Sequence, residues 1–430
     1  MLGGRVVKML SEYKNKLFNY AKANSKEFVM ASVAQVIYLT QSLVQNKIFT
    51  SFFSTAVYGK WAILVSVYSL ISMIPFSSID QGIYKVAYTN REKGNEKELY
   101  SLIAISYFLG FCIYTIIFVA MNIVQENGFF ANGYLAYFCL YAFTEIIKNS
   151  FVVIDNAYRN RKRVLVLRIF GFTSRTILFI ITYLLGRFTI KNVLLILFVT
   201  NMCIFIYQKD YFRKITIRVN QKVMVDLKSE IVRFSKPLMI WAIFGWMQNM
   251  IGRWYLNRFV DLESVAMYSI LVAVSYFVPS AIYAVLNAYV MPVVFSKDRA
   301  VTPKLLLMYM GTVGVTFVAY WWFVYFAGSW MILLLTSPDY LRITKYLPIT
   351  TASASIYVLA QLSTIEIFRK GKTNLLLIPN IIPGLSMSTI GFFLIKCFRM
   401  EGAVVNYVMG QILYSIMVFY VVVRDMKMRE

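Results

Sequence analysis

One apolar pattern occurs twice in the sequence, which reads VYGKWAILVSV at residues 57–67 and SVAMYSILVAV at residues 264–274. In each copy a small residue precedes an aromatic residue by two positions, and Ile-Leu-Val and a final Val follow. A second pair, YRNRKRVLV at 158–166 and FRKGKTNLL at 368–376, recurs at nearly the same spacing. Two similar halves in an apolar chain are typical of a transporter, because the halves can rock around a shared central site.

The composition predicts an all-α, polytopic membrane protein. Hydrophobic residues make up 59% of the chain and charged residues 15%, which is too apolar for a soluble fold. The long apolar runs lack the alternating polarity of a β-barrel. Windows of about 18 or more mostly apolar residues predict about 12 transmembrane helices. We expect them at 28–49, 61–79, 99–124, 133–154, 164–185, 190–207, 237–257, 264–290, 305–327, 346–367, 375–395 and 402–423.

These spans divide into two pseudo-symmetric bundles of six helices. We expect an N-terminal bundle within residues 1–207, in which residues 1–27 form a helix on the cytoplasmic membrane surface. Residues 208–236 form a basic cytoplasmic linker with an amphipathic helix that ends at Pro237, and residues 237–430 form the second bundle. Because each half has an even number of spans, both halves have the same orientation in the membrane.

The formal net charge of +24 is explained by membrane topology. With the N-terminus inside, the inner segments carry about four times as many Lys and Arg residues as the outer loops, as the positive-inside rule requires. This asymmetry predicts that both termini are cytoplasmic. The basic residues therefore contact anionic lipid, and we expect no nucleic-acid partner.

Several kinds of chemistry have no support in the sequence. The chain has no histidine, and its four cysteines have no CxxC spacing, so we expect neither a metal site nor a cofactor. No GxxxxGK[ST] phosphate loop is present. The outer loops are too short for a catalytic domain, so we expect a protein that is not an enzyme.

Charged and polar residues follow single faces of several predicted spans. A charge at mid-bilayer costs roughly 2.5–3.5 kcal/mol on insertion scales, so such residues require partners or water. Arg175 lies at the centre of the fifth span, Lys148 in the fourth and Arg253 in the seventh. We expect these three cations to line a hydrated cavity between the bundles, where guanidinium groups suit a phosphate or carboxylate cargo.

Each of these charges also has a structural interpretation. Glu145 and Lys148 are three residues apart and could neutralise each other, and Glu145 could instead pair with Arg175. Arg253, near the outer end of its span, could extend its side chain to the interface. Glu366, near an inner interface, could be an ordinary boundary charge.

The chain resembles the polysaccharide flippases. The resemblance rests on the YG-x-W-A motif at 58–62, the YRNRKR turn at 158–163, Lys-Pro-Leu at 236–238 and VAMYSI at 265–270. These flippases export O-antigen and capsule repeat units and belong to the multidrug/oligosaccharidyl-lipid/polysaccharide superfamily, whose fold is MATE-like. The resemblance extends over nearly the whole chain.

The resemblance implies a specific activity. The chain would move undecaprenyl-pyrophosphate-linked oligosaccharide across the bacterial inner membrane by alternating access, driven by a proton or sodium gradient, and a polysaccharide polymerase and a chain-length regulator would be its partners. The head group would lie in the cationic cavity while the lipid tail stays in the bilayer. The candidate substrate-binding residues are Arg175, Arg253, Lys148, Gln45, Asn249, Tyr276 and Asn287. The candidate ion-coupling residues are Glu145, Asp155 and Glu366.

Two other functions remain open from the sequence. A multidrug/cation antiporter of the same fold would need an acidic cavity, whereas this cavity is predicted to be cationic. A membrane-embedded polysaccharide polymerase or acyltransferase would need catalytic groups in a sizeable outer loop, which the sequence lacks.

Overall fold

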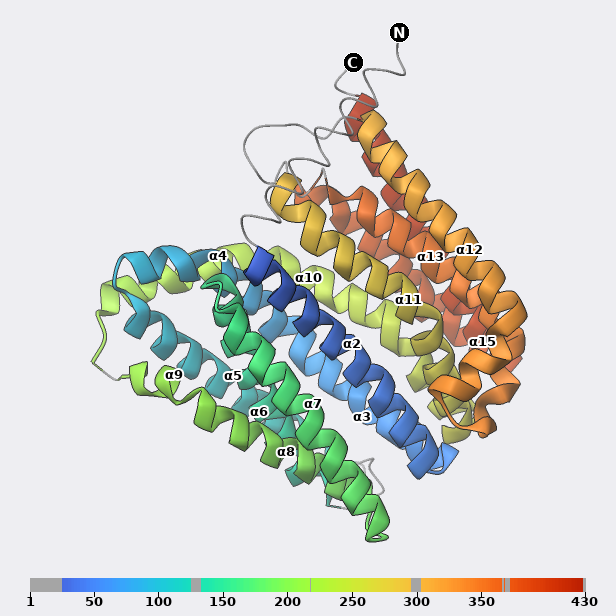
Figure 1. Cartoon of the computed structure of the whole chain (residues 1–430), viewed down its shortest axis with the longest axis horizontal. Coiled ribbons are helices and arrows are strands. Elements are labelled where there is room, and N and C mark those ends of the chain that lie inside the picture. Colours follow the sequence, from blue (N-terminus) through green and yellow to red (C-terminus); the bar gives the residue numbers. More distant parts are fainter. Residues whose placement is uncertain are drawn as a thin grey trace.

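In the computed structural model every regular element is helical across the described residues, which are 25–124, 133–216, 218–294, 303–365, 367 and 372–427 (Figure 1). The elements are α2 (Ser25–Phe52), α3 (Thr55–Ile71), η1 (Ser72–Ser77), α4 (Ser78–Glu92), α5 (Glu96–Val124), α6 (Tyr134–Ala157), α7 (Arg161–Leu184), α8 (Ile190–Tyr207), α9 (Lys209–Lys214), α10 (Gln221–Phe259), α11 (Leu262–Val294), α12 (Pro303–Leu335), η2 (Pro338–Tyr346), α13 (Leu347–Ser363), η3 (Thr373–Leu376) and α15 (Leu377–Lys427).

The predicted polytopic helical architecture is confirmed. Within the described ranges, eight segments are both long enough and apolar enough to cross a membrane. Each predicted span falls in a helix, and the second runs through α3, η1 and α4. The predicted surface helix at residues 1–27 lies almost wholly outside the described residues.

The last two predicted spans share α15, which folds back on itself at Arg399. This residue has φ 50° and ψ −121°, so the chain reverses there and the two arms run antiparallel. The arms approach closely near the reversal: a Cβ on Gly402 would lie 2.0 Å from the carbonyl oxygen of Leu394. Further along, the Asn406 side chain donates to the carbonyl of Met387 at 3.1 Å. A glycine at position 402 is what allows this contact.

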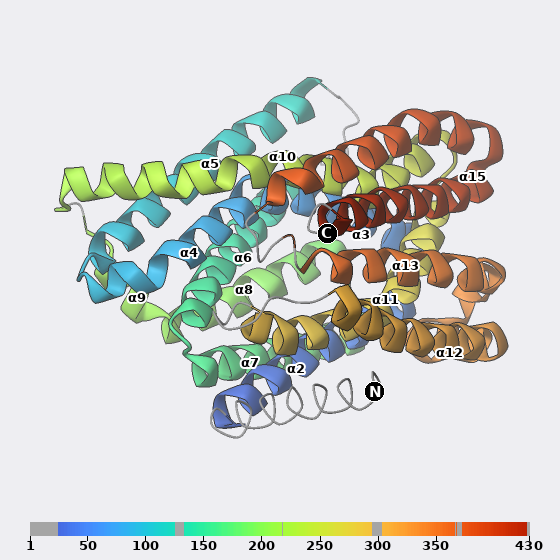
Figure 2. The same ribbon diagram turned by 90° about the horizontal axis from the view of Figure 1, so that it is seen from above.

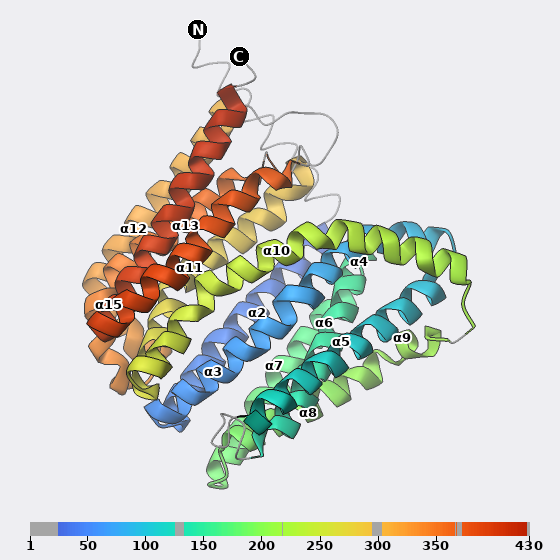
Figure 3. The same ribbon diagram turned by 180° about the vertical axis from the view of Figure 1, so that it is seen from behind.

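The helices form two groups that lie close together at one end of the molecule and spread apart toward the other (Figures 1 and 3). One group contains α2 to α8 and the other α10 to α15. We call the end where α2 ends and α3 begins the outer end, and the opposite end the inner end. Helix α2 packs against α7, while α13 packs against both α11 and α15.

The two copies of the repeated apolar pattern meet at the junction of these groups. The first copy lies in α3, the second lies in α11, and the two helices pack against each other. A Cβ on Gly59 would lie 1.9 Å from the carbonyl oxygen of Leu262, so only glycine permits this approach. Trp246 donates to the carbonyl of Ser66 at 2.9 Å and Trp254 to its hydroxyl at 3.0 Å. The repeat therefore forms part of the contact surface between the halves.

Helix α10 is longer than the sequence predicts. The expected linker helix and the seventh span form one helix, which continues through Pro237 instead of ending there. A proline removes one backbone hydrogen bond, and neighbouring helices offset that loss in a membrane bundle. The first turns of α10 pack on α4 of the other half, where Leu227, Ile231 and Ser235 are buried. Figure 2 shows α10 extending past α5 and α4.

Candidate functional site

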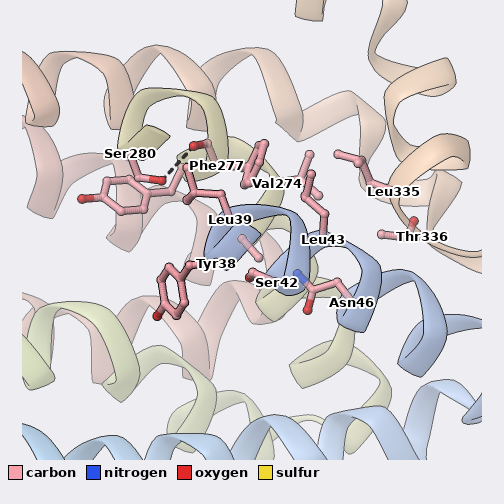
Figure 4. A pocket seen from close by; sticks show the side chains of 12 residues that line it. Tyr38, Leu39, Ser42, Leu43, Asn46, Val274, Phe277, Ser280, Leu335 and Thr336 are labelled. Atoms are coloured by element: carbon pink, nitrogen blue, oxygen red, sulfur yellow. Dashed lines mark hydrogen bonds between the residues drawn. The ribbon is translucent and has the colours of Figure 1, made fainter. Parts of the chain in front are cut away.

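A cavity of about 260 Å³ lies between the two halves, at the facing sides of α2 and α11 (Figure 4). Its polar groups are hydroxyls and an amide, and no charged side chain is among its lining residues. Rings from both halves contribute apolar surface. The lining residues are Tyr38, Leu39, Ser42, Leu43, Asn46, Ala273, Val274, Tyr276, Phe277, Ser280, Leu335 and Thr336. Aromatic rings beside hydroxyl and amide groups suit a ligand that is polar but uncharged, such as carbohydrate.

A lysine bridges the two halves on the outer side of this cavity. The Lys47 ammonium of α2 donates to the carbonyl of Leu333 at 2.7 Å and to that of Thr336 at 2.5 Å, at the end of α12. The last carbonyls of a helix lack partners within the helix, and a cation there is favourable. Since Leu335 and Thr336 also line the cavity, this contact lies at its border toward the outer end.

A buried charge cluster lies inside the N-terminal half. The Glu145 carboxylate of α6 accepts a hydrogen bond from Arg175 of α7 at 2.8 Å and another from Lys148. Asn201 of α8 completes the cluster, since its oxygen accepts from Arg175 at 2.8 Å and its amide donates to Glu145 at 3.0 Å. The structure therefore contains both ion pairs that the sequence left open. Two cations share one carboxylate, which leaves a formal surplus of one positive charge.

Arg168 of α7 connects this cluster to the cavity. Its guanidinium lies 4.5 Å from the ring centroid of Tyr38, which lines the cavity. Among the described residues it forms no hydrogen bond and no ion pair, so none of them competes with a ligand for its donors. Arg168 lies seven residues before Arg175, a spacing that puts both on one helix face, but the sequence analysis did not identify it as part of a site.

Arg253 of α10 lies apart from the cluster. Its guanidinium donates to Ser269 Oγ of α11 at 2.9 Å and to the carbonyl of Asn249 at 2.7 Å, and it contacts Met250 Sδ at 2.7 Å. In the described part of the chain no carboxylate pairs with it. Neither Arg253 nor Ser269 lines the cavity, but Ser269 is one helical turn from Ala273, which does, so Arg253 bonds to α11 one turn beyond the outer end of the cavity lining.

The other predicted residues have different positions. Tyr276 lines the cavity, whereas Gln45 is half-buried beside it on α2 and is not among the lining residues. The Asn249 amide donates to the carbonyl of Gly245 in its own helix at 2.8 Å. The side chain of Asn287 and all of Glu366 lie outside the described residues.

Asp155 is fully buried at the inner end of α6. Its carboxylate accepts hydrogen bonds from Tyr211 of α9 and, at 3.1 Å, from Asn160. Arg163 Nε lies 3.8 Å from its second oxygen, which makes an ion pair. Asp155 thus connects α6 to α7 and α9, away from the cavity between the halves.

The sequence analysis missed one acidic residue. Asp80 was expected just beyond the end of the second span, yet it is 9% exposed and lies within the apolar segment Thr55–Ala87. Tyr107 of α5 donates to its Oδ1 at 2.6 Å and Ser150 of α6 at 2.8 Å. An aspartate next to a long apolar run was the available signal, but the sequence could not show which helices enclose it.

No protein-family model and no curated protein sequence matches the chain, whereas solved structures resemble it along nearly all of its length. A multidrug resistance MATE family transporter of the MOP superfamily, in an inward-facing conformation, has 14% sequence identity and a TM-score of 0.69, over 94% of this chain and 98% of its own. A mutant of the Vibrio cholerae MATE transporter VcmN has 12% identity and a TM-score of 0.69, over 96% and 98%. The lipid II flippase MurJ, in an inward closed conformation, has 11% identity and a TM-score of 0.70, over 91% and 86%.

These comparisons establish the fold. The chain is a multi-pass membrane protein with a MATE-like arrangement of helices, as the sequence predicted. That fold is shared by transporters that carry drugs and by a flippase that carries a lipid, so the cargo must be argued from the site itself.

Proposed function

We propose that this MATE-like membrane protein is a flippase that moves a polyprenyl-diphosphate-linked oligosaccharide, such as an undecaprenyl-pyrophosphate-linked repeat unit, across a bacterial inner membrane. The observation that carries the proposal is a neutral cavity between the halves with a guanidinium near each end. Arg168 lies beside Tyr38 toward the inner end, and Arg253 bonds to Ser269 one turn beyond Ala273. Neither guanidinium is paired with a carboxylate among the described residues.

The chemistry of the cargo matches both the neutral cavity and the two guanidinium groups near it. Sugar rings offer hydroxyls and apolar faces, which suit the rings of Tyr38 and Tyr276 and the polar groups of Ser42 and Asn46. A diphosphate needs charge-assisted hydrogen bonds from planar guanidinium groups, which Arg168 and Arg253 have available. The lipid tail would remain in the bilayer beside the helices.

The state of the molecule supports alternating access. At the outer end the halves are held together by Lys47 and by the α3–α11 contact, whereas toward the inner end the helices spread apart except where α10 packs on α4 (Figure 1). Loading would then take place from the inner side, which the charge asymmetry assigns to the cytoplasm. Transport requires the outer contacts to break and the inner ends to close, with a proton or sodium gradient as the source of energy. The product would pass to a polymerase and a chain-length regulator outside the membrane.

Export of cationic drugs is the alternative for this fold. A cationic ligand would need a carboxylate in the cavity, but none is among its lining residues. The carboxylate of Glu145 is shared by two cations, and Asp155 is paired with Arg163. The residues around the cavity therefore favour an anionic head group.

Transport in proteoliposomes tests the proposal directly. The purified protein would be reconstituted and offered either a fluorescent polyprenyl-diphosphate disaccharide or ethidium, a planar cationic dye. We expect gradient-dependent transfer of the diphosphate lipid across the bilayer and no transport of the dye. Transport of the dye without transfer of the lipid would contradict the flippase assignment and support the drug exporter.

A further inference from the structure

Asp80 has no counter-charge among the residues that the structure describes, unlike the other buried acidic side chains described in this half. Its Oδ1 accepts from Tyr107 at 2.6 Å and from Ser150 at 2.8 Å, and within the described residues no hydrogen bond reaches Oδ2. Glu145 and Asp155, by contrast, each form an ion pair with a lysine or arginine. In the described part of the chain, the hydrogen-bond partners of the Asp80 carboxylate are therefore neutral hydroxyls.

The elements around Asp80 supply no charge to it. Helix α4 packs against η1, α5, α6 and α10. Tyr107 of α5 is the titratable group that faces Asp80, and α6 presents the hydroxyl of Ser150. Segment η1 contains no charged residue, and the α4–α10 ion pair between Lys85 and Glu230 is exposed. An isolated carboxylate at membrane depth is costly, so the site favours uptake of a cation.

The groups around Asp80 suit a small, hard cation. They are the carboxylate, two hydroxyls and the carbonyl of Phe76, which lies 3.4 Å from the Tyr107 hydroxyl. All are oxygen atoms, and carbonyls at a helix break are typical of proton and sodium sites in transporters. In the described residues no nitrogen or sulfur ligand accompanies them that would favour a transition metal.

The position of Asp80 connects it to the contact between the halves. It follows η1, a π-helical segment that contains Pro75, and such breaks are points where helices bend. Two residues beyond Asp80, a Cβ on Gly82 would lie 2.8 Å from Ser235 Oγ of α10, so α4 contacts the other half closely there. A change of charge at Asp80 therefore acts on a bendable helix at the boundary between the halves.

We propose that Asp80 binds the small monovalent cation, a proton or a sodium ion, that drives the change between inward-facing and outward-facing states. This assignment rests on one part of the proposed function, which is that transport is coupled to a cation. It does not depend on which cargo is carried. It also assigns coupling to a residue other than Glu145 and Asp155, which are neutralised by permanent partners.

The test measures conformation without cargo. After replacement of the four native cysteines, spin labels at Ser51→Cys on α2 and Arg342→Cys on η2 report the distance between the outer ends of the two halves. Both positions are exposed. Distances would be recorded in liposomes at acidic and alkaline pH without sodium, and at constant pH with and without sodium. The pH arm detects a proton and the sodium arm detects Na⁺.

The comparison variants are Asp80→Asn, Tyr107→Phe and Ser150→Ala, with Asp226→Asn as the matched control because Asp226 is exposed on α10. We expect the distances in the unmodified protein to respond to one cation, Asp226→Asn to respond in the same way, and Asp80→Asn to lose the response. If the cation is a proton, Tyr107→Phe should raise the pH midpoint by about one unit, because its hydroxyl stabilises the carboxylate. If it is sodium, loss of this oxygen should weaken the sodium response instead.

Two results would overturn the assignment. One is an Asp80→Asn protein that responds to the cation like the unmodified protein, and the other is an unmodified protein that responds to neither cation. Should Asp80→Asn fail to fold, unchanged midpoints in both Tyr107→Phe and Ser150→Ala would overturn it equally. A failure to flip the diphosphate lipid leaves these distances unaffected, so the two proposals can fail separately.

Discussion

Arg175 and Arg253 are both arginines at membrane depth, one in each half, yet their surroundings differ. Arg175 hydrogen-bonds to Glu145 and Asn201, and Lys148 shares the same carboxylate. Arg253 bonds to a serine hydroxyl and a backbone carbonyl. The first arginine is part of a charge network that holds three helices together, whereas no carboxylate among the described residues balances the second.

This difference separates stability from binding. Removing one partner of a buried ion pair leaves the other charge buried without compensation. Such a substitution therefore lowers the free energy of unfolding. A cation without a counter-charge gains no comparable stability from an ion pair, which is why we propose a ligand-binding role for Arg253. Sequence spacing treated Lys148, Arg175 and Arg253 as one cationic set, but the structure places them in two environments.

The largest effect is expected from Glu145→Gln, which removes the shared carboxylate. Two buried cations would then lack a counter-charge, and we expect a loss of stability of about 3–5 kcal/mol. Thermal unfolding in detergent, followed by tryptophan fluorescence, measures it. The control is Glu230→Gln, because Glu230 is exposed and its pair with Lys85 is worth about 1 kcal/mol or less. Equal effects of the two substitutions would refute a structural role for the cluster.

The second prediction is that Arg253→Met spares stability and reduces transport. Loss of a guanidinium that binds phosphate should lower the rate of diphosphate-lipid transfer about 100-fold, or about 2.7 kcal/mol. Its Tm should stay the same or rise, since an unbalanced charge is replaced by an apolar side chain. Arg258→Met is the control because Arg258 is exposed in the last turn of the same helix. If Arg253→Met lost as much thermal stability as Glu145→Gln, Arg253 would have the same structural role as the charge cluster, and the difference between the two arginines would be refuted.

The third prediction concerns Arg168, which lies between the cluster and the cavity. Arg168→Met should lower the transfer rate about tenfold, which is near the worth of one charge-assisted hydrogen bond. Tyr38→Phe keeps the ring that the guanidinium contacts and should have little effect. A transfer rate in Arg168→Met equal to that of the unmodified protein would limit phosphate binding to the C-terminal half.

Much of the fold was predictable because apolar runs in a membrane chain leave few alternatives. Length and hydropathy predicted a polytopic chain of membrane-spanning helices, which the structure confirms. The MATE-like arrangement was expected from the resemblance to the polysaccharide flippases, and the likeness to solved transporters agrees with it. Helical spacing also placed Glu145 and Lys148 on one face. The pair between Glu145 and Arg175 of α7 was one of the alternatives that the sequence left open, but Asn201 of α8 was not foreseen, because its place depends on packing between helices.

The site was less predictable for the same reason. Its cavity is lined by neutral residues of α2 and α11, and such residues carry no signal in an apolar sequence. Asp80 was missed because its burial depends on α5 and α6, and α10 continues through Pro237 because α4 supports it. Charges were easy to find in the sequence, whereas the partners that decide their roles come from other helices.

The smallest effect is expected at the outer contact, where both halves meet through Lys47. Lys47→Met removes two hydrogen bonds to carbonyls at the end of α12, and one of these is exposed, so we expect a shift of about 1 kcal/mol toward the outward-facing state. This shift is about fivefold in the ratio of the two states. The distance between labels at Ser51→Cys and Arg342→Cys measures it.

Lys345→Met is the control, because Lys345 pairs with Glu401 within one half and does not bridge the two. Since the α3–α11 contact with Gly59 remains, the outer end should loosen without opening fully; a complete opening would mean that Lys47 alone holds the halves together.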